Sequence, residues 1–279
     1  LGICGVVAQA ATDITLLGPP GSGKGTLGSE LSRVYGLPRI STGELVRAEI
    51  HAGTAFGLAV KSVTEMGGLI QDATPLGHEL LSKLKQEISK PKYANGVIFD
   101  GYPRTKWQAE ELEKVLSQMG RKISLAPNLV VPKDILLERA EGRLVCQNCN
   151  ISYHKIFMPP ADGNKCGKCC RDLTRRADDA REVVEKRIDL FEKEIAPLLA
   201  FYQSRGVLKD IDGAHQSSNT LAQLQPLLDP KKYLRRDYLA DTISSIPGSK
   251  PGVPKFYNIV EIYENPELFR SISERMAEI

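Results

Sequence analysis

Residues 18–26 of the sequence read Gly-Pro-Pro-Gly-Ser-Gly-Lys-Gly-Thr and could bind a phosphate group. Glycines let the backbone curl so that successive N–H groups point at one anion, and a following helix adds the partial positive charge of its N-terminus. Lys24 can reach the outer phosphates of such a ligand. Gly25 separates this lysine from Thr26, whereas the general phosphate-loop pattern has Ser or Thr directly after the lysine. We predict a phosphate loop, the alternative being a glycine turn that only joins a strand to a helix.

Four cysteines stand in two Cys-x-x-Cys pairs, which are Cys146 with Cys149 and Cys166 with Cys169. This spacing is typical of a zinc ribbon, in which four thiolates close a tetrahedral shell around a structural zinc ion. Such an ion would stabilise a segment that has no core of its own. The alternatives are two disulfides, uncoordinated thiols, or a nucleic-acid-binding ribbon, which the few neighbouring basic residues disfavour. We assign no role to Cys4 or Cys170.

Six arginines lie near expected element ends or beside the cysteine segment, namely Arg47, Arg104, Arg139, Arg143, Arg176 and Arg187. Phosphoryl transfer spreads negative charge over several oxygens, and planar, permanently charged guanidinium groups suit that charge. Any one of these arginines taken alone would be a solvated surface side chain. Beside a phosphate loop, the six together favour a site for phosphoryl transfer.

Asp100 follows the apolar run at 97–99, which we expect to be a buried strand. A carboxylate at such a strand end can hold the water shell of Mg²⁺ opposite a phosphate loop. The alternative is an aspartate that caps the following turn. We favour the metal role because a phosphate loop is present.

The chain has 279 residues, of which 42% are hydrophobic, so it can bury a full core. A formal net charge of +3 suits small anionic ligands and does not indicate nucleic acid. No stretch approaches the roughly 18 apolar residues of a membrane span. The mildly apolar lead at 1–12 begins at Leu1, which fits a removed targeting segment or a shortened chain. We expect an organelle, mitochondrion or chloroplast, with the cytoplasm as the alternative.

Apolar spacing predicts strands that alternate with helices. The expected strands are 13–17, 38–41, 97–99, 128–131 and 207–211, and the expected helices are 27–35, 55–66, 74–88, 106–119, 133–141, 178–202 and 219–228. Ser41 or Thr42 is expected to cap a further helix, with Glu44 at capping-box distance from Ser41. Pro197 should bend or restart its helix. The alternation predicts an α/β fold with a parallel sheet covered on both faces, and ligands beyond the carboxyl ends of its strands.

Two regions depart from this alternation. The segment 144–173 is polar and too irregular for a core helix. After residue 229 come a basic cluster, an extended linker at 247–254, a strand-like run at 256–263 and a terminal helix from 266. This extension either packs on the rest of the chain or docks on another protein by strand addition or helix-in-groove binding.

Several motifs together resemble the adenylate kinase family in its long-lid, zinc-binding form. The matching segments, in order, are 18–26, 41–48, 100–105 with Gln108, 138–143 and 175–179. The resemblance implies a P-loop NTPase-type parallel sheet sandwiched by helices, with a zinc-ribbon lid insertion and an AMP-binding helical arm. It also implies reversible transfer of a phosphoryl group from ATP to AMP, giving two ADP, with Mg²⁺ and no covalent intermediate. The kinase domain would span 13–229, with the arm at about 41–70, the lid at about 144–181 and the extension at 230–279.

The resemblance further implies a role for each matching residue. The ATP phosphates would be bound by Gly21, Ser22, Gly23, Lys24, Gly25 and Thr26, with Arg139 and Arg143. AMP would be bound by Thr42, Arg47, the backbone of Gly68 to Ile70, Gly101, Arg104 and Gln108. The transferring group would be contacted by Lys24, Arg104, Arg143, Arg176 and Arg187, with Asp178 and Asp179 ordering the arginines. The metals would be held by Asp100, for Mg²⁺ through water, and by Cys146, Cys149, Cys166 and Cys169, for Zn²⁺.

Three positions depart from the family pattern. Leu144 stands where a second arginine is usual, Gln71 interrupts a loop that usually reads Leu-Val-Pro-Asp or similar, and Tyr102 replaces a usual phenylalanine. Leu144 and the extension motivate one alternative, a catalytically weak kinase-fold subunit of a larger assembly. GTP:AMP transfer is the other alternative, because contacts to the donor base are largely made by backbone. A uridine- or cytidine-monophosphate kinase is disfavoured, because those relatives generally have a short lid without the cysteine pairs.

Overall fold

The computed structural model describes residues 12–149, 151–176, 179–214 and 217–228. The chain divides into two compact units, 1–220 and 221–279, and the fold described below is that of the first. The expected lead up to residue 11, the extension at 230–279 and Asp178 lie outside the described residues. In the described part, no helix combines the length and the hydropathy needed to cross a membrane.

The core of the fold is a parallel sheet, as the sequence predicted. Its five strands lie in the order β2-β3-β1-β4-β7, and each neighbouring pair is parallel. They are β1 (Thr12–Leu16), β2 (Arg39–Ser41), β3 (Gly96–Asp100), β4 (Ile123–Val130) and β7 (Leu208–Asp212). Because parallel strands end at the same edge, Leu16 pairs with Asp100, and Asp100 with Ser41. The loop after β1 therefore opens beside Asp100.

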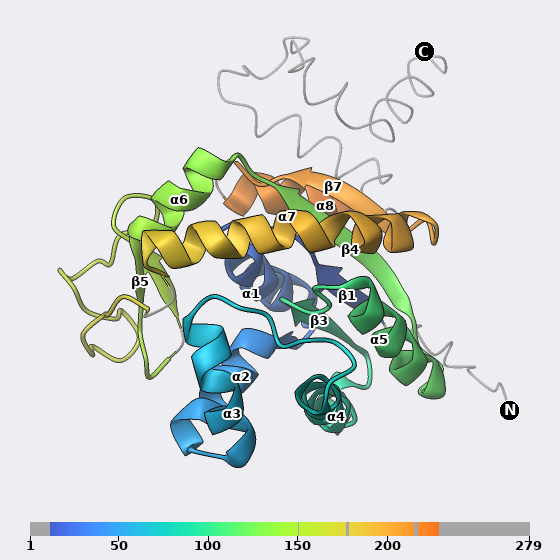
Figure 1. Cartoon of the computed structure of the whole chain (residues 1–279). Coiled ribbons are helices and arrows are strands. Elements are labelled where there is room, and N and C mark those ends of the chain that lie inside the picture. The colour runs from blue at the N-terminus through green and yellow to red at the C-terminus, as the bar shows by residue number, and fades with distance from the viewer. Residues whose placement is uncertain (1–11, 150, 177–178, 215–216, 229–279) are drawn as a thin grey trace, which may run out of the picture. The chain divides into compact units, whose positions relative to one another are not determined.

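Helices connect the strands and cover the sheet (Figure 1). They are α1 (Lys24–Tyr35), α2 (Thr42–Ala52), α3 (Ala55–Glu65), α4 (Pro75–Ile88), α5 (Lys106–Gln118), α6 (Lys133–Glu141) and α7 (Arg181–Gln203), with a short 3-10 turn η1 (Pro91–Tyr93). A further helix, α8 (Ser217–Leu228), follows β7 in the sequence and continues into the second unit. Of the two expected caps, Ser41 and Thr42, it is Ser41 that caps α2, by accepting a hydrogen bond from the Glu44 backbone N–H. Pro197 lies inside α7, which runs through it without the predicted restart. The residues after Pro197, such as Leu198 and Tyr202, are fully buried, and this packing stabilises the continuation.

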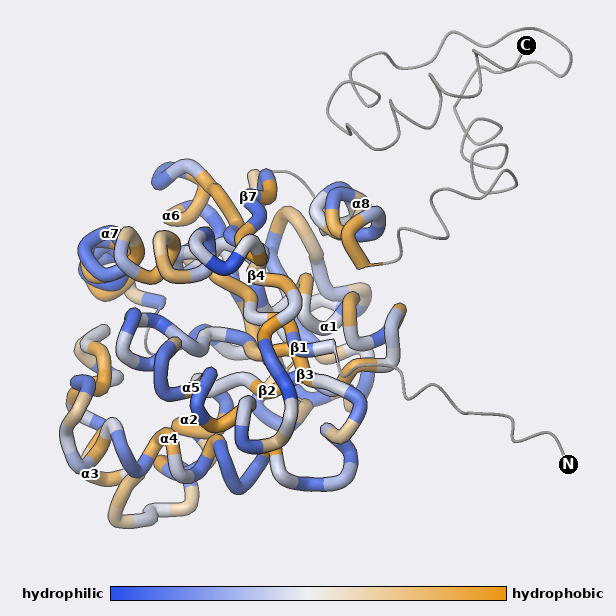
Figure 2. The backbone as a smooth tube through the Cα atoms, turned by 90° about the vertical axis from the view of Figure 1, so that its right-hand side faces the viewer, coloured by the Kyte–Doolittle hydropathy of each residue, from blue (hydrophilic) through white to orange (hydrophobic). Residues whose placement is uncertain are grey.

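Hydrophobic side chains pack on both faces of the sheet. Val97 and Phe99 of β3 belong to one cluster with buried residues of α4, α5 and α7. Ile98 alternates with them and faces the opposite side, where α1 contacts β3. In Figure 2 the inner strands β3 and β4 are mainly hydrophobic segments, whereas hydrophobic and hydrophilic residues alternate along the helices. This is the pattern expected for a sheet buried on both faces.

The segment predicted to be irregular contains a small antiparallel hairpin instead of coil alone. Its strands are β5 (Arg143–Val145) and β6 (Ser152–His154), and Val145 also pairs with Thr174. Strands of three residues are too short to give a readable alternation, so the sequence did not reveal them. In Figure 1 this hairpin and the α2–α3 pair both lie on the left side of the sheet.

A buried ion pair joins β1 to the turn before β4. The Arg121 guanidinium donates two hydrogen bonds to the Asp13 carboxylate, one of them at 2.9 Å. The Asp13 side chain is fully buried and that of Arg121 is 8% exposed. Each of the two buried charges therefore has the other as its partner in a bidentate geometry, and removing one would leave the other buried alone.

We expect Arg121→Met to lower the free energy of unfolding by about 3–5 kcal/mol, because it leaves the Asp13 carboxylate buried without its partner. Lys114→Met is the matched control, since the Lys114 side chain is 67% exposed in its pair with Glu111; it should change stability by less than about 1 kcal/mol. Urea unfolding of both variants measures the difference. An equal decrease in the free energy of unfolding in both variants would show that the buried pair contributes no more to stability than the exposed one.

Candidate active site

The loop between β1 and α1 has the backbone conformation of an anion site. Gly21 has a φ of +84°, and a side chain there would place its Cβ 3.0 Å from the backbone oxygen of Leu136. Gly23, at the N-cap of α1, has a φ of +95° and provides no side-chain cap. The first N–H groups of α1 are therefore available to an anion in the cleft. This is the geometry that the glycine spacing predicted.

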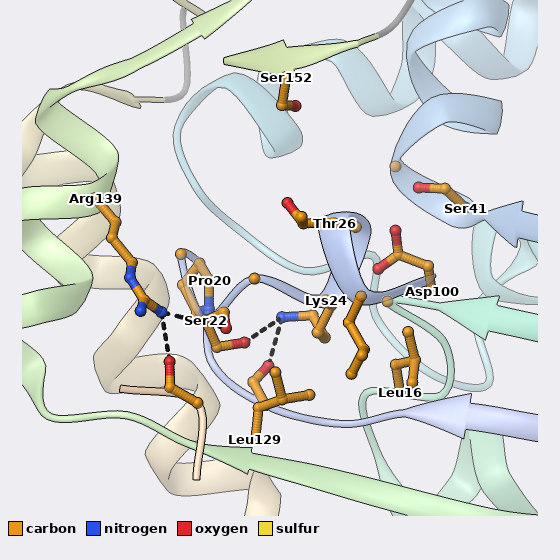
Figure 3. Close-up of a pocket in the computed structure, with 18 of the residues that line it drawn as sticks. Leu16, Pro20, Ser22, Lys24, Thr26, Ser41, Asp100, Leu129, Arg139 and Ser152 are labelled. Atoms are coloured by element: carbon orange, nitrogen blue, oxygen red, sulfur yellow. Dashed lines mark hydrogen bonds between the residues drawn. The ribbon is translucent and has the colours of Figure 1, made fainter. Parts of the chain in front are cut away.

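Lys24 is held against the same loop. Its ammonium donates to the backbone oxygens of Gly18 and Pro19, each at 2.7 Å, and lies 3.4 Å from Ser22 Oγ (Figure 3). Burial lowers the pKa of Lys24 to about 7, against the opposing attraction of Asp100. The positive charges of Arg104, Arg187 and Arg143 lower this pKa further. An anionic ligand at this point would favour the charged ammonium and raise the pKa of Lys24 again.

The predicted arginines meet in one cleft of about 1230 Å³, which is larger than a pocket for one small molecule. The cleft is lined by Lys24, the phosphate loop and all six arginines, which are Arg47, Arg104, Arg139, Arg143, Arg176 and Arg187. These arginines come from α2, the loop after β3, α6, β5, the segment before α7, and α7 itself. Long-range folding therefore produces the cluster that the sequence only suggested.

Two of the arginines, on the side of α6 and β5, are oriented by contacts within the protein. Arg143 forms a bidentate pair with Asp179, whose carboxylate is fully buried. Arg139 donates to the backbone oxygens of Gly213 at 2.7 Å and Ala214 at 2.9 Å. Both guanidinium groups are thus fixed before any ligand binds, which reduces the entropy lost on binding.

On the opposite side, the loop after β3 organises a second set of predicted residues. The backbone oxygen of Gly101 accepts hydrogen bonds from Arg104 Nε and Thr42 Oγ1, both at 2.9 Å. Gln108 Oε1 accepts from the Arg104 backbone N–H at 2.9 Å. Thr42 and Gln108 are buried behind residues that line the cleft, rather than lining it themselves.

Asp72 supports this second set and was not predicted as a site residue. Its carboxylate accepts from Gln108 Nε2 at 2.9 Å and from Thr105 Oγ1 at 2.5 Å. Sequence alone gave no sign of this contact, because the partners lie 33 and 36 residues apart. Of the neighbouring loop, Gly67 and Leu69 line the described cleft, whereas the predicted Gly68 and Ile70 do not.

Asp100 lies at the end of β3, beside the phosphate loop, as predicted. Its Oδ2 accepts a hydrogen bond from Arg39 Nη1 at 2.6 Å. Arg39 Nη2 also donates to Glu44 Oε1 at 2.5 Å. Neither Arg39 nor Glu44 was predicted at the site, because the sequence did not show that β2 pairs with β3. In Figure 3 the Asp100 carboxylate and the Thr26 hydroxyl project into the same pocket.

The four paired cysteines come together in the lid. Their sulfur atoms all lie within 4.8 Å of one another, and all four thiols are free. The predicted alternative of two disulfides is therefore absent from this part of the structure. Leu144 is 9% exposed and packs with Cys146, Cys166 and Leu173. Leu144, which stands where a second arginine is usual, is therefore part of the small hydrophobic core of the lid.

His154, which sequence reasoning missed, joins the lid to α6. Its Nδ1 accepts hydrogen bonds from the backbone N–H groups of Ile156 and Phe157, at 3.0 and 3.1 Å. Its Nε2 lies 3.4 Å from the backbone oxygen of Glu138. Burial lowers the pKa of His154 and favours the neutral ring that this arrangement requires. A single histidine in an irregular segment carries no signal from which to predict this role.

Comparison with known proteins agrees with the geometry. The sequence profile of the Adenylate kinase family matches residues 16–207. The chain is 39% identical to an adenylate kinase of Geobacillus sp. (strain WCH70) over 216 residues, which cover 77% of this chain and 98% of that relative. It is 40% identical to an adenylate kinase of Lysinibacillus sphaericus (strain C3-41) over 220 residues, which cover 79% and 99% of the two chains. For an adenylate kinase of Archaeoglobus fulgidus the identity is 36%, with the same coverage. Because the profile spans most of the chain and these relatives are matched almost end to end, the chain belongs to the adenylate kinase family.

Proposed function

We propose that this protein transfers a phosphoryl group reversibly between ATP and AMP, giving two ADP. The observation that carries the proposal is the meeting of a phosphate loop and six arginines in one cleft. That cleft is large enough for two nucleotides whose phosphates face each other. The presence of this whole charged set in one cleft argues against the alternative of a kinase-fold subunit without turnover. The burial of Leu144 in the lid core removes one motive for that alternative.

The two nucleotides occupy opposite sides of this cleft. The ATP phosphates bind the backbone from Gly21 to Thr26 and Lys24, with Arg139 at the edge of the loop. AMP binds near Arg47 and Arg104, on the side of α2 and the loop after β3. The contacts of Gln108 with Asp72 and the Arg104 backbone support this side of the cleft from behind and hold the loop that carries Arg104 in place.

Catalysis consists of positioning and charge stabilisation. Arg143, Arg176 and Arg187 converge with Lys24 on the phosphoryl group in transfer, where negative charge is spread over its oxygens. Asp179 fixes Arg143 in its orientation. The attacking phosphate oxygen of AMP and the leaving oxygen of ADP are held in line, so no covalent intermediate is needed. Closure of the lid over the cleft excludes water that would otherwise hydrolyse ATP.

The donor set of the cleft suits Mg²⁺ bound with ATP. The Thr26 hydroxyl and the Asp100 carboxylate are hard oxygen ligands on the same pocket wall. Thr26 would contact the ion directly or through water, and Asp100 would hold its water shell. When bound, the ion neutralises negative charge on the phosphate oxygens.

The cysteine cluster suits a structural Zn²⁺. Four sulfur atoms within 4.8 Å of one another match the tetrahedral shell of a closed zinc site, with no open position for catalysis. We assign the ion the role of holding together the lid, whose hydrophobic core is small.

Arg104→Ala should slow the formation of ADP from ATP and AMP by about 100-fold or more, because it removes a charge-assisted contact to the AMP phosphate that attacks the transferred group. Lys106→Ala is the control, since the Lys106 side chain is 56% exposed on the neighbouring helix; it should keep the wild-type rate. A coupled assay measures both, and a parallel run with GTP identifies the preferred donor. Equal rates for wild type and Arg104→Ala would exclude the role of Arg104.

Binding of ATP at pH 8 should take up close to one proton through Lys24. With a pKa of about 7, the side chain is mostly neutral at pH 8 in the free protein, and the phosphates raise this pKa again. The affinity for ATP therefore falls as the pH rises above 7, up to the pKa of the bound state. Calorimetry in buffers of different ionisation enthalpy counts the protons, with Lys24→Met as the control that lacks the uptake. Binding by the wild type without uptake at pH 8 would contradict this linkage.

Cys149→Ser should reduce the zinc content well below one ion per chain and lower Tm by about 5 °C or more, because an incomplete shell binds zinc weakly. The exposed Cys170 lies outside the cluster, so Cys170→Ser should keep both zinc and Tm. Atomic absorption and calorimetry measure the two properties. Wild-type protein without zinc after growth with added zinc would count against the metal site.

A further inference from the structure

Arg39 lies between two carboxylates on the wall of the cleft. It donates to Asp100 Oδ2 at 2.6 Å and to Glu44 Oε1 at 2.5 Å. The side chains of Arg39, Asp100 and Glu44 are 19%, 11% and 30% exposed. All three line the cleft beside the phosphate loop. One guanidinium therefore neutralises part of the negative charge that the two carboxylates present to a ligand.

The surrounding elements make room for this arginine. A Cβ at Gly28 of α1 would lie 2.9 Å from Arg39 Cδ, so a side chain there would displace the aliphatic part of Arg39 from its present position along this helix. A Cβ at Gly25 would lie 3.4 Å from Asp100 Oδ2 and 3.7 Å from Arg39 Nη1. The guanidinium is thus placed at the first turn of α1, next to the loop that binds phosphate.

Electrostatics keep the arginine in this position. Burial lowers the pKa of Arg39, but Glu44 and Asp100 outweigh that effect and leave the pKa raised. The guanidinium is planar and contacts the two carboxylates through different nitrogens, which a lysine could not do in the same geometry. The arrangement is therefore a specific three-residue cluster rather than a loose surface pair.

We propose that Arg39 weakens the binding of divalent cations beside ATP, because its guanidinium competes with them for the carboxylate of Asp100. This inference rests on the proposed role of Asp100 in holding the water shell of Mg²⁺. Asp100 and Glu44 together carry two negative charges, and Arg39 reduces this to a net single charge. Arg39 weakens the binding of a cation at Asp100 in two ways. Its guanidinium already occupies one oxygen of the Asp100 carboxylate, and its positive charge repels the cation. Occupation of the site therefore requires a higher concentration of free Mg²⁺ than it would if Asp100 and Glu44 were present without Arg39.

The test measures metal binding instead of turnover. Mn²⁺ is titrated into the full chain with saturating ATP and no AMP, and free Mn²⁺ is followed by electron paramagnetic resonance. Arg39→Gln should bind Mn²⁺ about tenfold more tightly than wild type, because one fixed positive charge is removed within a few ångströms. Arg39→Lys keeps the charge and should stay within about threefold of wild type. Arg171→Gln, which removes an exposed arginine of the lid, should leave the affinity unchanged.

The possible results separate the inference from the proposal on which it rests. Unchanged or weaker Mn²⁺ binding in Arg39→Gln overturns the inference, as does equal tightening by Arg39→Lys or Arg171→Gln. If the wild-type protein with ATP binds no more Mn²⁺ than ATP alone, the proposed metal role of Asp100 fails first. The thermal unfolding of each variant shows that the comparison is made between folded proteins.

Discussion

The active site depends on holding several positive charges close together. The buried Lys24 ammonium is stabilised by two backbone oxygens of its own loop, and its lowered pKa reports the residual cost. The nearby carboxylates each hold an arginine in place, Asp179 for Arg143 and Asp100 for Arg39. These internal pairs fix the guanidinium groups, so that a polyphosphate meets an arrangement already formed.

The features that the sequence predicted well are those encoded over short distances. The phosphate loop follows from glycine spacing, the parallel sheet from alternating apolar segments, and the cysteine cluster from two Cys-x-x-Cys pairs. In each case the prediction rests on a local pattern, namely the glycine-rich loop, the apolar run of each strand or the Cys-x-x-Cys pair. The motif at Ser41 and Glu44, which caps α2, is of the same kind.

The features that the sequence did not reveal depend on contacts between distant segments. Arg39 and Asp100 are 61 residues apart, and their contact requires that β2 pairs with β3. Asp72 meets Gln108 only because the loop before α4 packs on the start of α5. From the sequence, Leu144 was interpreted as the loss of a positive charge that the family usually has at this position. Its side chain is instead part of the hydrophobic core of the lid. Spacing within the chain carries no information on these choices.

The way in which the lid joins the rest of the domain has a consequence for how such a protein can diverge. Val145 and Thr174 pair with each other, so the chain leaves the domain and returns to it at adjacent points. The intervening residues have their own small core around the thiols. Insertions, deletions or the replacement of the cysteines by other core residues would thus be confined to an exchangeable module, and the sheet that carries the nucleotide loop would keep its register.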